Sequence, residues 1–187
     1  MTRNRIVQHL INKNGYKSYL EIGVEYGQTF TKILCPKKVG VEPYVDGWLK
    51  MTSDEFFAQN KDAFDVVFID GLHEKEQVEK DIRSSLKILN PNGSVVIHDC
   101  NPTSESMQKV PREQLEWTGD VWKAFVGFRE YSDLEMYVVD TDYGCGVIKK
   151  GEQIPLDIKE LTYEKLIENK KEWLNLISVN EFLEKMQ

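Results

Sequence analysis

Residues 18–29 constrain the possible folds of this chain more than any other stretch. A short apolar run at residues 19–22 stops at Gly23, and apolar residues at helical spacing follow Gly27 over residues 30–34. This order predicts a strand, a glycine-bearing turn and the start of a helix. Such a turn lets the backbone approach a ligand closely, while free N–H groups at the helix start face the same crevice. The stretch therefore predicts a nucleotide-binding turn.

The spacing of the two glycines indicates which ligand such a turn accepts. The dinucleotide fingerprint is Gly-x-Gly-x-x-Gly, whereas this chain has three residues between Gly23 and Gly27, with Glu25 at the place of the second glycine. A glutamate there would repel a pyrophosphate group. The turn therefore favours a ligand without phosphates over a nicotinamide cofactor, and a dehydrogenase becomes the weaker alternative.

A second pattern predicts a parallel sheet. Residues 64–70 are nearly all apolar and either β-branched or aromatic, which is typical of a central strand buried on both faces. Apolar residues at helical spacing run from Val78 to Leu89, and residues 94–98 predict the next strand. A strand–helix–strand unit of this kind is a parallel crossover, so both strands end at the same edge of the sheet. Further strands are predicted at residues 38–42, 48–51, 134–139 and 146–149.

The length of 187 residues predicts a single domain covering residues 1–187. An N-terminal helix is expected within residues 1–17, packed against the sheet edge or covering a ligand. Residues 101–119 are polar, contain two prolines and show no period, which is typical of a substrate lid. Two C-terminal helices are expected within residues 160–187, where alternating Glu and Lys indicate a solvated face, with a homodimer contact as the other interpretation.

Composition excludes several classes of protein. Lys and Arg total 24 against 31 Asp and Glu, a net charge of −7, which argues against a nucleic-acid-binding protein. Three cysteines without Cys-x-x-Cys spacing indicate neither a disulfide framework nor a structural zinc site. No apolar run approaches the roughly 18 residues that span a bilayer. We therefore expect a cytoplasmic protein that acts on a small molecule and not at a membrane.

Polar residues follow the predicted strands at their ends. Glu21 closes the first strand, Glu42 the second and Asp70 the buried central strand, while His98 and Asp99 close the next one. In open α/β sheets, ligands bind outside these strand ends, near the point where the strand order reverses. We therefore expect these side chains to lie around one site.

The residues at this edge can support two chemistries. Asp70, His98 and Asp99 offer two oxygen donors and an imidazole, a set that binds Mg²⁺ or Mn²⁺. Without a metal, Asp70, His73 or His98 is the candidate catalytic base, and imidazole is the best matched to neutral pH.

Two of these motifs together resemble a known family. Glu21-Ile-Gly23-x-x-x-Gly27, followed by Val-Gly-Val-Glu42-Pro, is similar to the class I S-adenosylmethionine-dependent methyltransferases. The resemblance implies a Rossmann-like, doubly wound, mostly parallel seven-stranded sheet with helices on both faces. It also implies that Glu21, Gly23 and Gly27 hold the methionine part of S-adenosylmethionine, and Glu42 the ribose. Glu42 lies 19 residues beyond Gly23, close to the offset of about 20 residues expected for a ribose-binding acid.

A narrower resemblance rests on two further motifs. Ile-Asp70-Gly-Leu-His73-Glu and Val-Val-Ile-His98-Asp99 resemble a metal-associated branch called methyltransferase family 24. Some relatives in that branch methylate sugar hydroxyls with the help of a divalent cation held by acids at these strand ends. This chain departs from several of them at Leu72, where they carry a second acid.

The resemblance also implies that the stretch containing Thr52 and Ser53 approaches the adenine ring and that Asp70 contacts the cofactor. The spacing of Thr52 and Glu55 is equally that of a helix capping box, which would explain Thr52 without any ligand.

These observations predict O-methyl transfer to a small-molecule or sugar hydroxyl. A sulfonium methyl group is already activated, so the enzyme mainly aligns the acceptor and removes its proton. A hydroxyl acceptor needs a base or a metal that lowers its pKa. The alternative is a non-catalytic S-adenosylmethionine-binding sensor or partner subunit, in which Asp70, His98 and Asp99 would be dispensable.

Overall fold

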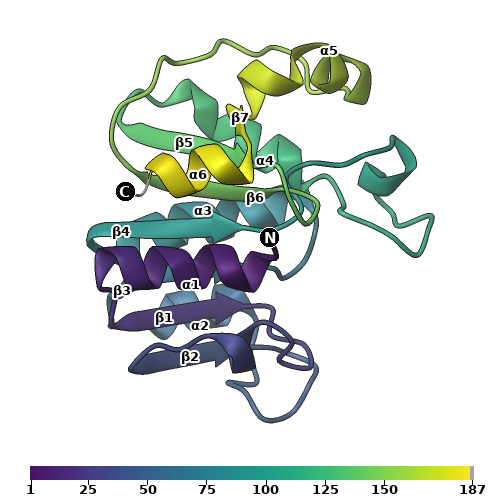
Figure 1. The fold of residues 1–187 in the computed structure, drawn as a ribbon. Helices are drawn as coiled ribbons and strands as arrows, with labels where there is room; N and C mark the ends of the chain where they lie inside the picture. The colour runs from purple at the N-terminus through teal and green to yellow at the C-terminus, as the bar shows by residue number, and fades with distance from the viewer. Residues whose placement is uncertain (186–187) are drawn as a thin grey trace.

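The computed structural model describes residues 1–185, whose strands form a seven-stranded sheet with helices on both faces (Figure 1). The strands are β1 (Ser18–Ile22), β2 (Lys37–Val41), β3 (Phe64–Ile69), β4 (Leu89–Ile97), β5 (Leu134–Val139), β6 (Cys145–Lys150) and β7 (Leu176–Ile177). The helices are α1 (Arg3–Asn14), α2 (Ser53–Gln59), α3 (Lys75–Ile88), α4 (Val121–Gly127), α5 (Tyr163–Trp173) and α6 (Val179–Lys185).

The strand order is β2-β1-β3-β4-β6-β5-β7. Strands β2, β1, β3 and β4 are parallel, and β6 runs antiparallel to both β4 and β5. The expected doubly wound, mostly parallel sheet is confirmed. Its strand order reverses between β1 and β3, so a site at this switch point faces their C-terminal ends.

The seventh strand is not the one that the sequence predicts. Residues 48–51 do not form a strand, because only Leu49 bridges to Val41. The Leu49 N–H donates to the Gly40 carbonyl, and Thr52, three residues later, is already the N-cap of α2. Residues 48–51 therefore contribute a single paired residue, Leu49, beside β2. The seventh strand of the sheet is instead β7, which was not predicted and which pairs in parallel with β5 over two residues.

Two hydrophobic cores hold the layers together. One lies between the sheet and α2, α3, α4 and α5, and the other between the sheet and α1 with α6. Helix α1 packs on a sheet face (Figure 1) and not at the sheet edge, which was one of its two expected positions. Its Ile6 and Val7 are fully buried, and Arg3 in its first turn lines the cavity described below. The helix ends at Gly15, whose φ of 66° forms a left-handed cap.

The helix predicted after Gly27 is absent. The chain makes only one 3₁₀ turn, η1 (Phe30–Lys32), and Leu34 is exposed. Because β2 is parallel to β1, residues 28–36 must carry the chain back along a five-residue strand, about 17 Å. A helix over residues 28–34 would advance only about 10 Å and would leave the rest of the distance to two fully extended residues. The connection is instead mostly extended, and no α-helix begins between Gly27 and β2.

Strand β4 begins at Leu89, five residues before the predicted start. Its pairing with β3 shifts register between Phe64 and Val66, so residues 90–93 form a bulge. Pro91 lies in this bulge, where its missing N–H breaks no regular ladder bond.

The remaining predicted segments are placed as follows. Residues 101–119 form a loop with one 3₁₀ turn, η2 (Ser106–Gln108), and a second 3₁₀ turn, η3 (Phe128–Glu130), follows α4. Helices α5 and α6 lie within the predicted range 160–187, of which residues 186 and 187 are outside the described part. Among residues 1–185, no helix has the length and apolar character needed to cross a membrane.

We predict that Gly23→Ala is strongly destabilising. Gly23 has a φ of 82°, and a Cβ there would lie 2.3 Å from the Asp70 carbonyl oxygen. The clash with rigid backbone should lower the free energy of unfolding by about 3 kcal/mol or more in urea denaturation.

Gly15→Ala is the matched control for this variant. Gly15 also has a positive φ, but no atom lies within 4 Å of the position that a Cβ would take there. The control should cost only about 1–2 kcal/mol. Equal losses in the two variants would contradict a steric requirement at Gly23.

Candidate active site

A cavity of about 780 Å³ opens at the C-terminal edge of the sheet, a size typical of small-molecule sites. The turn after β1, the end of β2, the start of α2 and the ends of β3 and β4 contribute to it. Nine of the ten residues predicted for the site line this cavity, namely Glu21, Gly23, Glu42, Thr52, Ser53, Asp70, His73, His98 and Asp99.

Gly27 is the predicted site residue that does not line the cavity. A Cβ at Gly27 would lie 2.9 Å from the indole ring of Trp48, so the glycine makes room for that ring. Trp48 in turn donates an indole N–H to the carbonyl of Glu25 at 2.9 Å. Gly27 therefore lets Trp48 pack against the turn and does not itself face the cavity.

Glu42 fastens this turn to the end of β2. One of its carboxylate oxygens accepts the backbone N–H of Glu25 at 2.9 Å, and the other accepts that of Tyr44 at 2.9 Å. Each oxygen keeps a second acceptor site. Glu42 can therefore still bind a ligand hydroxyl, and the residues present fit a ribose-bearing cofactor.

Glu21 is a neutral acid at the floor of the cavity. Its side chain is 1% exposed and accepts a hydrogen bond from the hydroxyl of Tyr19. Burial raises the pKa of Glu21 to about 8, against the opposing effect of the Tyr19 hydrogen bond. At neutral pH this carboxyl is therefore mostly protonated and can donate as well as accept.

The start of α2 supplies a further polar wall. Thr52 and Glu55 form the capping box that the sequence predicts. Ser53 faces α3, where its hydroxyl accepts from the amide of Gln77 at 3.1 Å, and the same amide reaches Asp81 at 3.1 Å. Burial raises the pKa of Asp81 to about 6. Gln77 and Asp81 also line the cavity, but their helical spacing alone gave no reason to predict it.

Two carboxylates and two imidazoles alternate at the ends of β3 and β4. Oδ1 of Asp70 lies 3.4 Å from both Nε2 of His73 and Nδ1 of His98. Asp99 approaches the same rings, with Oδ1 3.2 Å from Nδ1 of His98 and Oδ2 3.3 Å from Nδ1 of His73. We call these four residues the acid–imidazole cluster.

Charge pairing within this cluster outweighs burial. Burial by itself would lower the pKa of His98, but Asp70, Asp142 and Asp99 raise it well above its ordinary value. The pKa of His73 is raised in the same way by Asp70 and Asp99, against burial. Conversely, burial would raise the pKa of Asp70, but the two imidazoles hold it far below its ordinary value.

The cluster fits a divalent cation. One donor atom each from Asp70, His73 and Asp99 lie within 4.8 Å of one another, so His73 replaces the predicted His98 in the most compact set. Nδ1 of His73 is buried and, although Oδ2 of Asp99 lies 3.3 Å away, makes no hydrogen bond within residues 1–185. Two carboxylates and one imidazole are suitable ligands for Mg²⁺ or Mn²⁺. Leu72 is half exposed at the cavity wall.

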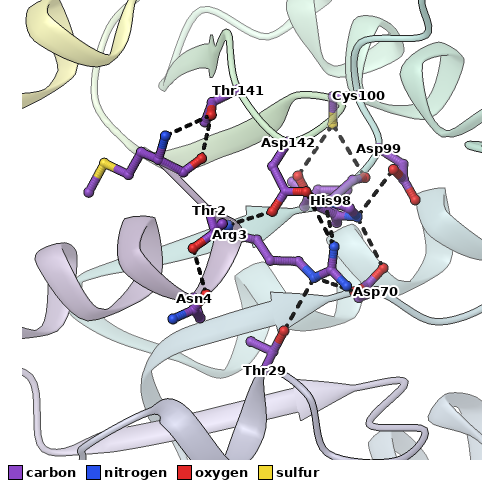
Figure 2. Close-up of polar contacts among 12 residues, drawn as sticks. Thr2, Arg3, Asn4, Thr29, Asp70, His98, Asp99, Cys100, Thr141 and Asp142 are labelled. Atoms are coloured by element: carbon purple, nitrogen blue, oxygen red, sulfur yellow. Dashed lines mark hydrogen bonds and ion pairs between the residues drawn. The ribbon is translucent and has the colours of Figure 1, made fainter.

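Sequence reasoning missed two charged residues at this cluster, Arg3 and Asp142 (Figure 2). Asp142 lies in the turn between β5 and β6 with a φ of 51°, and its Oδ1 lies 3.6 Å from Nε2 of His98. The hydrogen bond to His98 lowers the pKa of Asp142 to about 2. Because β5 runs parallel to β4, the turn after it shares the edge where His98 lies. The position of Asp142 in the turn after a predicted strand could therefore have indicated it, whereas nothing in the sequence pattern indicated Arg3.

Comparisons with known proteins agree with this architecture. Residues 36–100 match a family described as a methyltransferase domain, methyltransferase family 24, and no curated protein sequence matches the chain. The SAH-bound methyltransferase PaMTH1 of Podospora anserina is 15% identical, with a TM-score of 0.62 and 81% of this chain and 80% of that chain covered. An O-methyltransferase of Bacillus cereus in complex with SAH is 13% identical, with a TM-score of 0.55 and coverages of 78% and 79%. The family match confirms the resemblance that the sequence motifs indicate, and the structures confirm the fold.

We predict that Glu21→Gln changes how stability depends on pH. In the unfolded chain Glu21 ionises near its ordinary pKa of 4.5, whereas in the folded protein it stays protonated until about pH 8. The folded state therefore holds more protons across this range, and the free energy of unfolding falls as the pH rises. Urea denaturation at pH 5 and pH 8 should show a loss about 3–4 kcal/mol larger in the wild type than in the variant.

The control for this prediction is Glu152→Gln, which removes an exposed carboxyl. It should follow the wild-type profile. Parallel profiles for the wild type and Glu21→Gln would show that the Glu21 carboxyl does not retain its proton at neutral pH.

Proposed function

We propose that this chain, an S-adenosylmethionine-dependent methyltransferase by its family match and its fold, methylates a hydroxyl group of a small molecule such as a sugar. The observation that carries the proposal is that one cavity joins Gly23 and Glu42 to the acid–imidazole cluster. A site that holds a cofactor beside potential bases is what methyl transfer to a hydroxyl requires.

The cofactor side is formed by the turn after β1 and the end of β2. The cofactor, when bound, would supply an activated methyl group. Glu42 would accept hydrogen bonds from the ribose hydroxyls, and the turn at Gly23, which also lines the cavity, would lie against the methionine part. The Thr52–Ser53 segment would border the adenine ring. Glu21, protonated at neutral pH, would offer a hydrogen-bond donor instead of a second negative charge.

The cluster side would prepare the acceptor. Because the pKa values of His73 and His98 are both raised, either ring would first have to lose its own proton to act as the base. Oδ1 of Asp70, 3.4 Å from a nitrogen of each ring, would then stay paired with the proton that the ring takes from the acceptor. Asp70, His73 and Asp99 would hold a divalent cation, which when bound lowers the pKa of an acceptor hydroxyl. An unprotonated amine needs neither device, so the cluster supports a hydroxyl acceptor.

The ring of Trp117 adds an aromatic wall beside the cluster. It stacks on His73 with ring centroids 5.4 Å apart, and both residues line the cavity. The loop of residues 101–119 would thereby position a planar or sugar-like acceptor next to the bases. This contact supports the lid role that the sequence predicts for the loop.

We predict that Glu42→Gln weakens binding of S-adenosylhomocysteine at least tenfold in isothermal titration calorimetry. Each carboxylate oxygen of Glu42 accepts one backbone N–H, but glutamine has only one oxygen, so one of these two hydrogen bonds is lost. One acceptor for the ribose is lost with it. Asp46→Asn is the control, because the Asp46 side chain is 86% exposed and pairs with Lys50. Unchanged affinity in Glu42→Gln would contradict the assignment of the ribose site.

We predict that Asp99→Asn separates binding from turnover. The variant should bind S-adenosylhomocysteine within about threefold of the wild type, yet form it from S-adenosylmethionine and a hydroxyl acceptor about 100-fold more slowly. The physical reason is the loss of a charge that contacts both imidazoles and is one of the three candidate cation ligands, together with Asp70 and His73. A panel of sugars and aromatic alcohols, with product measured by mass spectrometry, makes this test.

Asp157→Asn, at an exposed position, is the control for this variant. Full activity of Asp99→Asn would contradict the role of the cluster. Tight cofactor binding by the wild type without product from any acceptor would instead favour the non-catalytic sensor.

A further inference from the structure

Arg3 extends from the first turn of α1 into the acid–imidazole cluster (Figure 2). Its Nε lies 3.4 Å from Oδ2 of Asp70, and its Nη1 lies 3.5 Å from Oδ1 of Asp142. The backbone N–H of Arg3 donates to Oδ2 of Asp142 at 2.7 Å. Arg3 therefore brings a permanent positive charge to carboxylates from two separate parts of the chain.

Asp70 is shared between this ion pair and the candidate cation set. Oδ2 of Asp70 faces Arg3, while Oδ1 faces His73 and His98. The two oxygens of one carboxylate are only about 2 Å apart, so a cation on Asp70 would lie within a few ångströms of the guanidinium. Two positive charges would then depend on one carboxylate.

We propose that Arg3 sets the affinity of the cluster for a divalent cation, because the guanidinium and the cation compete for Asp70. The inference rests on the cation site of the proposed function. It assigns to Arg3 a role that neither the sequence motifs nor the candidate ligand set includes. The cluster carries its own counter-charge and binds a cation only at the expense of the contact with α1.

Two opposing effects decide the direction of the change when Arg3 is removed. An outer residue that orients a metal ligand typically contributes about 10–100-fold to metal affinity. Repulsion between a guanidinium and a divalent ion about 5 Å apart, in a partly buried site, corresponds to a factor on the order of 1,000 or more. The repulsion is the larger effect, so removal of the charge should strengthen cation binding about tenfold or more.

The contacts of Arg3 can give way. Both of its ion pairs are longer than the 2.7–2.9 Å typical of strong charge-assisted hydrogen bonds, and its side chain is 28% exposed. Its remaining side-chain contacts, to Thr29 and to Nε2 of His98, are both 3.3 Å long. Displacement of the guanidinium would therefore break no short hydrogen bond of the side chain.

The test is titration of the metal-free protein with Mn²⁺, followed by the electron paramagnetic resonance signal of the free ion. Arg3→Gln, which removes the charge, should bind Mn²⁺ at least tenfold more tightly than the wild type. Arg3→Lys, which keeps the charge, should stay within about threefold of the wild type. Arg5→Gln is the matched control, because Arg5 is exposed on the same helix.

Unchanged or weaker Mn²⁺ binding by Arg3→Gln would overturn the inference and leave Arg3 as an orienting partner of Asp70. Absence of Mn²⁺ binding in the wild type and all variants would overturn both the inference and the cation site. Calorimetry with S-adenosylhomocysteine on the same samples separates this outcome from failure of the methyltransferase assignment.

A second measurement needs no variant. Because coupling is reciprocal, Mn²⁺ that displaces Arg3 should loosen the first turn of α1. Hydrogen exchange in a peptide covering residues 1–10 should therefore become faster when the wild type binds Mn²⁺, with no such change in Arg3→Gln. Exchange that is unchanged or slower in the wild type with Mn²⁺ bound would contradict competition.

Discussion

The site depends on hydrogen bonds that continue the parallel ladder one residue beyond the strands. Gly23 donates its N–H to Val41, Asp70 donates to Ile22, and His98 donates to Ile69, at 2.9–3.0 Å. These bonds fix the ends of neighbouring strands in register, at the strand spacing of about 4.8 Å. Asp70 is thereby held between the glycine turn and His98, so one backbone constraint sets the distance between the cofactor side and the cluster.

Much of this arrangement could be predicted because it follows from local patterns. A buried apolar strand that ends in Asp70, and another that ends in His98 and Asp99, must bring those residues to one edge once the crossover is parallel. The capping box at Thr52 is equally local. Glu42 could be placed by its distance from Gly23 along the chain. Each of these predictions depends on one turn or one crossover unit and not on contacts between distant parts of the chain.

The parts that could not be predicted depend on distant geometry. The apolar spacing after Gly27 favoured a helix, but the short connection back to the start of β2 forms only one 3₁₀ turn. Strand β7 is two residues long and exists only because β5 offers a free edge. Arg3 is 67 residues from Asp70 in the chain, so their contact is a property of how α1 crosses the sheet face.

The charges lining the cavity affect the binding of the cofactor and the release of its product in the proposed reaction. Acidic side chains predominate there over the guanidinium groups of Arg3 and Arg112, and the whole chain carries a net charge of −7. A sulfonium cofactor is attracted by such a field, whereas its thioether product has lost the positive sulfur. The acidic lining therefore favours replacement of S-adenosylhomocysteine by S-adenosylmethionine, and this preference decreases as salt screens the field.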